Sequence, residues 1–255
     1  MRYGFIGDSH LGHIIPVWKN KAALGSITQT GLHTERTYGT EPLTILNQGQ
    51  VLAEFDDIKC AFSSKVELSD YDVFVVFGMH YSFTALAKTY AQYRTSSQAG
   101  KRSAYVLSDA AYTAMVDDLF QFSKAKRVID VLNKNTDKPV YYAQQPLPLE
   151  WVLDRPEASL RFFRELADSN DLPVLQDIYE EKLQDLERSG VRVLRQPAQT
   201  KSSLGFTLSQ FGHFKLDSIS PDDAKPKLDY VHMNATYGEL VAQEILNANT
   251  VDEDN

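Results

Sequence analysis

The stretch Asp72-Val73-Phe74-Val75-Val76-Phe77-Gly78 decides the fold that we predict for this chain of 255 residues. Five consecutive apolar residues stand between an acidic residue and a glycine, so a strand formed by them would be buried on both faces. Strands of this kind are typical of the interior of a parallel sheet that helices cover on both sides. The stretch therefore predicts a central strand of an α/β domain.

Shorter apolar stretches predict the rest of the sheet, and amphipathic stretches between them predict its helices. Further strands are expected at 3–6, 34–38, 139–143 and 191–194, with a hairpin at 42–58 that turns at Asn47–Gly49. Helices are expected at 14–24, 82–94, 108–122, 125–132, 156–168, 173–189 and 235–247. We predict one domain over residues 1–250, a three-layer α/β/α sandwich with a mainly parallel sheet of about five strands, and an acidic flexible tail at 251–255.

The composition excludes several classes of function. Lys and Arg number 26 against 34 Asp and Glu, and the formal net charge is −8, whereas nucleic acids and anionic membranes both require a basic surface. The most apolar stretch, Val73–Met79, is far shorter than a membrane-spanning helix. The first residues lack the apolar segment of a secretory signal, and a single cysteine, Cys60, cannot form an internal disulfide. We therefore expect a cytoplasmic protein with no nucleic-acid partner and no membrane insertion.

Gly7-Asp8-Ser9-His10 follows the first predicted strand directly. Ligands of an open parallel sheet bind at the carboxyl ends of its strands. A serine in a tight turn there exposes its hydroxyl group, and its own N–H lies near the start of a helix. An acyl-transfer nucleophile needs both, because such an N–H can stabilise the negative oxygen that forms during the reaction. Ser9 is therefore the candidate nucleophile, and Asp8 is expected to hold the turn through backbone N–H groups.

Asp229-Tyr230-Val231-His232 precedes the last predicted helix and supplies a candidate base, without which a serine is inert. The three-residue spacing lets the Asp229 carboxylate reach one ring nitrogen of His232. This contact fixes the tautomer and leaves the second nitrogen for the Ser9 hydroxyl. The sequence therefore predicts a catalytic triad of Ser9, Asp229 and His232.

These segments resemble those of a known family, the SGNH (GDSL-type) hydrolases. Gly7-Asp8-Ser9-His10 is similar to the first block of the family, Tyr71–Gly78 to the strand before its third block, and Asp229–His232 with Asn234 and Gly238 to its last block. The resemblance implies an SGNH/flavodoxin-like fold. It also implies an esterase, a lipase, a carbohydrate deacetylase or an O-acyltransferase that uses no metal and no cofactor.

The third block departs from the family pattern. The family has Gly-x-Asn-Asp there and uses the Asn side chain to bind the oxyanion, whereas this chain has Gly78-Met79-His80-Tyr81. The resemblance makes His80 a candidate oxyanion or substrate ligand through an imidazole N–H. The second block of the family contributes a glycine N–H, for which Gly39 is the preferred match and Gly49 the second.

Other interpretations of the same residues stay open. Ser9 could be only the N-cap of the first helix, and His10 and His13 are expected to be surface or helix-start residues. Asp8-Ser9-His10-Leu11-Gly12 also resembles the Asp-x-His-x-Gly opening of calcineurin-like metallophosphoesterases, where Asp and His bind a metal. A further alternative is a non-catalytic, carbohydrate-binding protein on the same fold.

The aromatic side chains are numerous, with 13 Tyr, 13 Phe and 2 Trp. Most of them are expected to pack in the core. A subset falls at the predicted edge of the active site, where it would suit a sugar ring or an acyl chain, although core packing is the expected role for most of this subset as well: Tyr38, Tyr81, Tyr142, Trp151, Phe206, Phe211 and Tyr230.

The function predicted from these residues is that of a serine-dependent esterase or O-acyltransferase. The expected substrate is a small acyl ester, such as an acetyl ester, of a small molecule or a carbohydrate. Hydrolysis and acyl transfer share their first half-reaction, so the sequence leaves the choice between them open.

Overall fold

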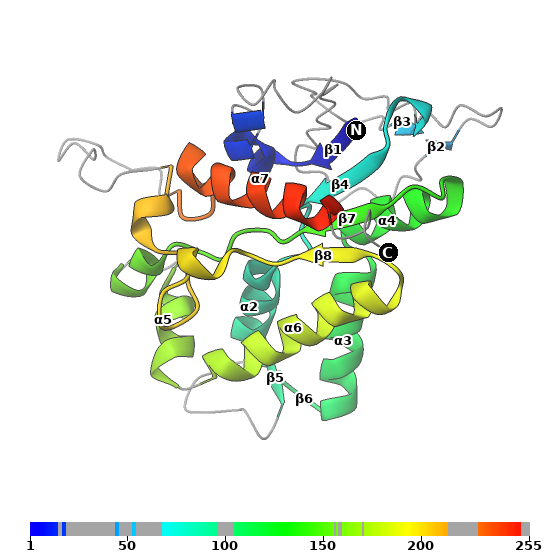
Figure 1. The fold of residues 1–255 in the computed structure, drawn as a ribbon. Helices are drawn as coiled ribbons and strands as arrows, with labels where there is room; N and C mark the ends of the chain where they lie inside the picture. The colour runs from blue at the N-terminus through cyan, green and yellow to red at the C-terminus, as the bar shows by residue number, and fades with distance from the viewer. Residues whose placement is uncertain are drawn as a thin grey trace.

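The computed structural model describes residues 1–14, 17–18, 44–45, 53–54, 68–95, 105–155, 157, 160–169, 171–213 and 229–250. Within these residues a parallel sheet forms the centre of the molecule and helices flank it (Figure 1). The predicted α/β class is confirmed. Gly39, Gly49, Cys60, the strand predicted at 34–38 and the tail 251–255 lie outside the described residues.

The sheet has four described strands, β1 (Tyr3–Gly7), β4 (Val73–Phe77), β7 (Val140–Ala143) and β8 (Arg192–Leu194). Their order is β1-β4-β7-β8, and all neighbouring pairs are parallel. Every residue of β1, β4 and β7 is buried, which the doubly apolar stretch of the central strand predicts. The parallel arrangement brings the carboxyl ends of these strands to one edge of the sheet.

The helices connect the strands or follow the last of them. They are α2 (Phe83–Gln92), α3 (Asp109–Gln121), α4 (Lys124–Asn135), α5 (Arg161–Asp168), α6 (Leu172–Arg188) and α7 (Ala235–Thr250). Ser82, Ser108 and Ser123 cap α2, α3 and α4, and each hydroxyl accepts a hydrogen bond of 3.2 Å from the N–H three residues later. No described helix is both long enough and apolar enough to cross a membrane.

Short elements fill the connections. They are the 3-10 helices η1 (Ser9–His13), η3 (Leu68–Asp70), η4 (Glu150–Asp154), η5 (Ala198–Thr200) and η6 (Ser209–Phe211). β2 (Thr44–Ile45) and β3 (Ala53–Glu54) pair antiparallel, as the predicted hairpin requires, although its turn lies outside the described residues. Most of the helix predicted at 14–24 also lies outside them.

The region after α2 differs from the prediction. The helix predicted to run to residue 94 ends at Gln92, because Tyr93–Thr95 forms β5 and pairs in parallel with β6 (Tyr105–Leu107). The Arg94 side chain turns back under the helix: its Nε donates to the Tyr90 carbonyl oxygen at 3.3 Å, and its guanidinium lies 4.9 Å from the centre of the Tyr90 ring. This contact joins the second residue of β5 to the last turn of α2.

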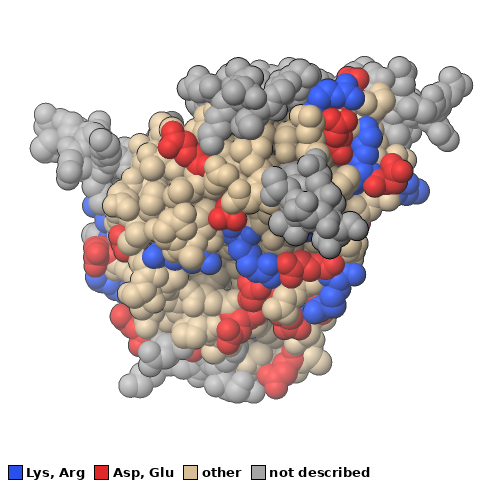
Figure 2. Space-filling model, viewed as in Figure 1, with Lys and Arg blue, Asp and Glu red and all other residues tan. Residues whose placement is uncertain are grey.

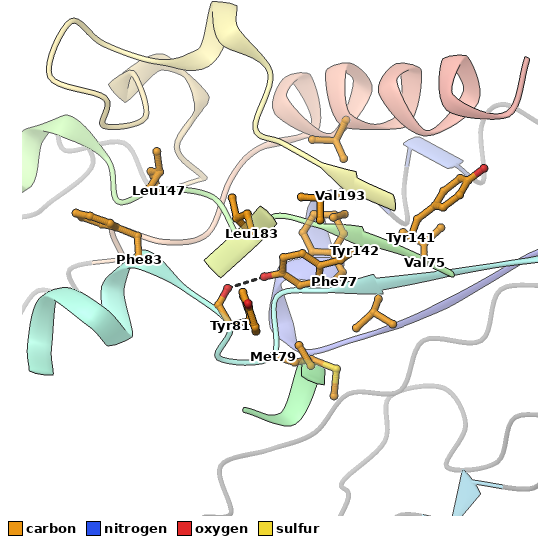
Figure 3. Close-up of a cluster of buried hydrophobic side chains, with 14 of the residues drawn as sticks. Val75, Phe77, Met79, Tyr81, Phe83, Tyr141, Tyr142, Leu147, Leu183 and Val193 are labelled. Atoms are coloured by element: carbon orange, nitrogen blue, oxygen red, sulfur yellow. Dashed lines mark hydrogen bonds between the residues drawn. The ribbon is translucent and has the colours of Figure 1, made fainter. Parts of the chain in front are cut away.

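Aromatic side chains hold the turn that follows β4. The Tyr142 hydroxyl donates to the Tyr81 carbonyl oxygen at 2.5 Å (Figure 3), and the Tyr179 hydroxyl donates to the same oxygen at 3.1 Å. Met79, within the turn, is fully buried. The backbone after β4 is therefore fixed by two buried hydroxyl groups.

The aromatic residues expected at the edge of the site lie mostly in the core. Tyr81, Tyr142, Trp151, Phe206 and Phe211 are each at most 6% exposed. Tyr230 is half-buried against Phe163, with ring centres 5.8 Å apart, and Tyr38 lies outside the described residues. Other side chains cover the five buried rings, so these rings have the packing role that was expected for most of the subset.

Candidate active site

Ser9 stands at the carboxyl end of β1 as the first residue of η1. The glycine before the turn is required by packing, since a Cβ atom on Gly7 would lie 2.7 Å from the Phe77 carbonyl oxygen of the neighbouring strand. Asp8 then caps η1 by accepting the His10 N–H at 3.1 Å. The close approach of Gly7 to β4 and the cap formed by Asp8 thus turn the chain sharply after β1. This turn brings Ser9 to the edge of the sheet.

The structure brings the three predicted triad residues together. The Ser9 Oγ lies 2.7 Å from His232 Nε2, and His232 Nδ1 lies 2.8 Å from Asp229 Oδ1. An ionised carboxylate can only accept hydrogen bonds. The neutral imidazole of His232 therefore donates a hydrogen bond from Nδ1 to Asp229, and its Nε2 accepts a hydrogen bond from the Ser9 hydroxyl. The geometry is therefore that of a nucleophile, a base and a group that orients the base.

The charges of the pair follow from these contacts. The hydrogen bond to Asp229 raises the pKa of His232, which burial alone would lower. Burial alone would raise the pKa of Asp229, but the hydrogen bond and the charge of His232 lower it overall. Asp229 therefore stays ionised at neutral pH and stabilises the imidazolium that forms when His232 takes a proton.

Hydrogen bonds within the loop that carries His232, and from this loop to residues 210–213, hold it in place. The Asp229 Oδ1 also accepts the His232 N–H at 3.1 Å, and the His213 N–H donates to the His232 carbonyl oxygen at 2.9 Å. The side chain of Asn234 donates to the Gln210 carbonyl oxygen at 2.8 Å and accepts the Tyr237 N–H at 3.1 Å. One amide thus caps α7 and ties its start to the loop before it, a positioning role that the sequence reasoning missed.

The position of α7 is set by its contact with η1. Figure 1 shows η1 and the first turn of α7 on the same side of the sheet, and the two helices are in contact. A Cβ atom on Gly238 would lie 2.1 Å from the His13 carbonyl oxygen, so only glycine allows this approach. The helix that follows the base therefore packs directly on the helix that begins with the nucleophile.

A second carboxylate–imidazole pair lies beside the first. The Asp8 Oδ1 is 2.6 Å from His10 Nδ1, and the His10 ring stacks on the His232 ring with their centres 5.1 Å apart. Burial alone would raise the pKa of Asp8, but the charge of His10 and its hydrogen bonds hold it well below its usual value. His10 Nε2 has no hydrogen-bond partner in the described part of the chain.

Asp8 also connects the first strand to the turn after β4. Its Oδ2 accepts the Met79 N–H at 2.9 Å, as predicted for a residue that holds backbone N–H groups. A Cβ atom on Gly78 would lie 2.9 Å from the Asp8 carboxylate, and Gly78 has a φ of 69°. Met79 and His80 follow with φ values of 56° and 68°, which are strained for residues with a side chain.

His80 is exposed at the end of this turn. Within the described residues, no hydrogen bond joins its ring to Ser9 or His232. Burial lowers the pKa of His80, Asp8 raises it, and Lys124, His10 and Lys88 lower it further. The ring therefore lies within the electrostatic field of Asp8, but its role at the oxyanion stays a prediction, as does that of Gly39 outside the described residues.

The expectation that His10 and His13 are surface or helix-start residues is wrong with regard to the surface. Both lie in η1, but they are only 6% and 4% exposed. The His13 ring packs edge-on against Phe77 and Tyr237, with ring centres 5.2 Å apart in each pair. Burial, assisted by the charges of His10 and His232, lowers the pKa of His13 to about 3, so this ring is neutral at physiological pH.

The contacts of Asp8 do not favour the alternative metal site at Asp8 and His10. The two oxygens of Asp8 accept hydrogen bonds from His10 and Met79, so they face donors instead of converging on an ion. Among the described residues, no group of three or more His, Cys, Asp or Glu side chains is placed to hold a metal ion.

No protein-family model matches the chain, and no curated protein shows significant similarity to it.

Proposed function

We propose that the protein is a serine-dependent esterase or O-acyltransferase of the SGNH type that acts on a small acyl ester. The proposal is carried by one observation, the continuous hydrogen-bonded chain from Ser9 through His232 to Asp229. The position of Ser9 at the carboxyl end of a parallel strand supports it, because ligands of such sheets bind at this edge.

In the proposed reaction, the Ser9 Oγ attacks the ester carbonyl carbon while His232 Nε2 accepts the hydroxyl proton. The new C–O bond gives a tetrahedral oxyanion, and the imidazolium is stabilised by Asp229. The intermediate collapses when the C–O bond to the alcohol breaks and His232 returns the proton to the leaving oxygen. Water or a second alcohol, deprotonated by His232, then releases the acyl group from Ser9.

The oxyanion needs donors that are in place before the reaction begins. The Ser9 N–H is the first candidate, and the family pattern adds the Gly39 N–H and a side chain after β4, here His80. Loss of one good donor costs about 10²–10³ in rate. A carbohydrate ester is the preferred substrate by resemblance to the family.

The test is labelling with a fluorophosphonate together with hydrolysis of a short acyl ester. Wild-type protein is expected to be labelled once per chain at Ser9 and to hydrolyse the ester, and Ser9→Ala is expected to lose both. The matched control is Ser203→Ala, which alters an exposed serine in a turn and should leave both intact. If Ser9→Ala hydrolyses the ester as fast as wild type, or wild type is neither labelled nor active, the proposal is wrong.

A further inference from the structure

Three glutamines stand where β7 and β8 end, at the carboxyl edge of the sheet: Gln144, Gln145 and Gln196. Two of them form hydrogen bonds within the protein. The Gln144 Oε1 accepts the Gln196 N–H at 2.8 Å, and the Gln196 Oε1 accepts the Leu147 N–H at 2.8 Å. The Gln196 Nε2 donates to two threonine hydroxyls. These two side chains therefore join the segments that follow the strands, which is a structural role.

Gln145 differs from the other two glutamines. It is only 7% exposed, yet its side-chain amide makes no hydrogen bond within the described part of the chain. The amide does not belong to the polar groups that are completely shut off from solvent without a partner, so it keeps contact with solvent. A mostly buried amide whose donors and acceptor are unmet costs free energy, because it loses hydrogen bonds to water. Binding of a ligand to this amide would offset that cost.

The sheet fixes the direction in which Gln145 points. The Phe77 ring packs on His13, so it lies on the face of the sheet that η1 covers. Ala143 is the partner of Phe77 in the register of β4 and β7, and its side chain therefore lies on the same face. The Gln144 N–H extends the pairing by donating to a carbonyl oxygen of β8 at 2.9 Å. Because side chains alternate along an extended chain, Gln145 also lies on the face of η1.

The same arrangement sets the distance between Gln145 and the candidate nucleophile. β4 separates β1 from β7, and neighbouring strands are about 4.8 Å apart, so the ends of β1 and β7 lie about 10 Å apart. The segment after Gln145 continues to the loop of the candidate base, where the Leu149 N–H donates to the Tyr230 carbonyl oxygen at 2.9 Å. Gln145 thus lies on the side of the sheet where Ser9 begins η1, at a distance that the alcohol part of a small ester can span.

The chemistry of an amide indicates what it binds. It is uncharged and both donates and accepts hydrogen bonds, and a hydroxyl group does the same. The acyl group of a small ester is apolar except for its carbonyl oxygen, which the oxyanion donors bind, so the partner of Gln145 belongs to the alcohol part. The face in Figure 2 mixes basic and acidic side chains, and so it offers no patch of one sign that would select a charged substrate.

We propose that Gln145 is a specificity-determining residue, which binds a free hydroxyl group on the alcohol part of the ester. This inference rests on the proposed function and narrows its substrate to esters of neutral alcohols with several hydroxyl groups, such as sugars. Ser9 attacks the acyl carbon, and Gln145 holds the alcohol part so that this carbon lies beside the Ser9 Oγ. A simple alkyl ester leaves the amide without a partner.

The first test compares neutral acetyl esters that differ in their free hydroxyl groups: ethyl acetate and the monoacetates of methyl glucoside. Wild type is expected to favour the best sugar ester by about tenfold in kcat/KM, mainly through KM. Gln145→Met keeps the length of the side chain and removes its hydrogen-bonding groups. It should abolish most of the preference and change kcat/KM for ethyl acetate by less than about twofold.

The matched control is Gln199→Met, which alters an exposed glutamine in η5 after β8 and should keep the preference. Circular dichroism and urea titrations confirm that both variants fold. Equal kcat/KM values for ethyl acetate and all the sugar esters in wild type, or a preference that survives Gln145→Met, would overturn the inference.

A second readout depends neither on catalysis nor on the folding of Gln145→Met. In Ser9→Ala, which should bind the ester without cleaving it, heteronuclear NMR follows the side-chain amide signals of the glutamines. The signals of Gln145 should shift with the sugar ester and not with ethyl acetate, and those of Gln199 should stay in place. Such shifts in a protein whose wild type has no esterase activity would contradict the proposed function and support the role of Gln145. Esterase activity without these shifts would contradict the role of Gln145 alone.

Discussion

Two Asp–His pairs lie side by side in this protein, and they differ in what the second ring nitrogen of the histidine contacts. In the pair Asp229–His232, Nδ1 meets the carboxylate at 2.8 Å and Nε2 meets the Ser9 hydroxyl at 2.7 Å. In the pair Asp8–His10, Nδ1 meets the carboxylate at 2.6 Å, and Nε2 has no partner among the described residues. Exposure also separates the pairs, because the side chain of His232 is 35% exposed and that of His10 only 7%.

The comparison shows that a carboxylate next to a histidine does not by itself identify a catalytic base. In the proposed function, the accessible pair transfers a proton between a nucleophile and a substrate. The buried pair connects two turns, since Asp8 also binds the Met79 N–H. We therefore expect changes in the first pair to alter the rate and changes in the second pair to alter stability.

The largest effect is expected at His232, and His10 provides the comparison. His232→Ala is expected to lower kcat/KM for a short acyl ester by about 10³-fold or more, because Ser9 loses its base. His10→Phe keeps an aromatic ring against His232 and should lower kcat/KM of the folded protein by less than about tenfold. Steady-state kinetics on both variants, with circular dichroism to confirm folding, check this. A loss in His10→Phe as large as that in His232→Ala would show that both pairs act on the substrate.

Changes at the two aspartates should differ in what they lower, the reaction rate at Asp229 and the stability of the fold at Asp8. Asp229→Asn is expected to lower kcat by about 10²–10⁴-fold, because an amide no longer holds the His232 tautomer or stabilises the imidazolium. Asp8→Asn should lower the free energy of unfolding by about 2–4 kcal/mol, since one buried acceptor oxygen becomes an NH₂ donor that faces another donor. Urea titrations and kcat measurements on both variants compare the two effects. The reverse outcome, with Asp229→Asn the less stable and Asp8→Asn the less active, would contradict the assignment.

A smaller effect concerns His13, the buried neutral histidine of η1. Its pKa is about 3 in the folded state against an ordinary value of 6.5. The unfolded chain therefore binds a proton in this interval that the folded protein excludes, and the free energy of unfolding falls as the pH falls below 6.5. At about pH 5 this loss amounts to roughly 2 kcal/mol.

His13→Phe should remove the contribution of His13 to the loss of free energy of unfolding at low pH, because phenylalanine does not titrate. Its apolar ring also suits the contacts with Phe77 and Tyr237. Urea titrations at about pH 7.5 and about pH 5 measure the difference in wild type and variant. Exposed His213→Gln serves as the control and should behave as wild type. An unchanged pH dependence in His13→Phe would show that other groups cause it.

The smallest effect is a shift in the pH–rate profile. His232 accepts the Ser9 proton only when it is neutral, and Asp229 raises its pKa above the ordinary 6.5. The rise of kcat/KM with pH should therefore have its midpoint above 6.5, and Asp229→Asn should move the midpoint to lower pH. Profiles measured from about pH 5 to about pH 9 show both midpoints. A midpoint that Asp229→Asn leaves in place would exclude His232 as the group that titrates.

The contacts within the candidate triad were predictable because each depends on a local or general rule. A spacing of three residues lets Asp229 reach the His232 ring, and the rule for parallel strands places Ser9 at the binding edge. The sheet was predictable for a similar reason, since doubly apolar strands indicate a buried parallel sheet.

The remaining features depend on contacts that sequence patterns do not encode. His10 and His13 are polar, and their burial follows from the packing of α7 on η1, a contact between distant segments. The left-handed conformations of Met79 and His80 are held by Asp8 and by the tyrosine hydroxyls below them, whereas the sequence signals only Gly78. β5 and β6 are three residues long, too short for alternation to be visible.

The distance of 223 positions between Ser9 and His232 has a consequence for the newly made chain. At about 5–20 residues per second, roughly 10–45 s of synthesis separate the two residues. During that interval the nascent protein holds a serine without a base, because η1 exists before α7 can dock on it. Under the proposed function, chains that lack α7 are expected to be inert toward esters, and activity would appear only in molecules in which α7 has packed on η1.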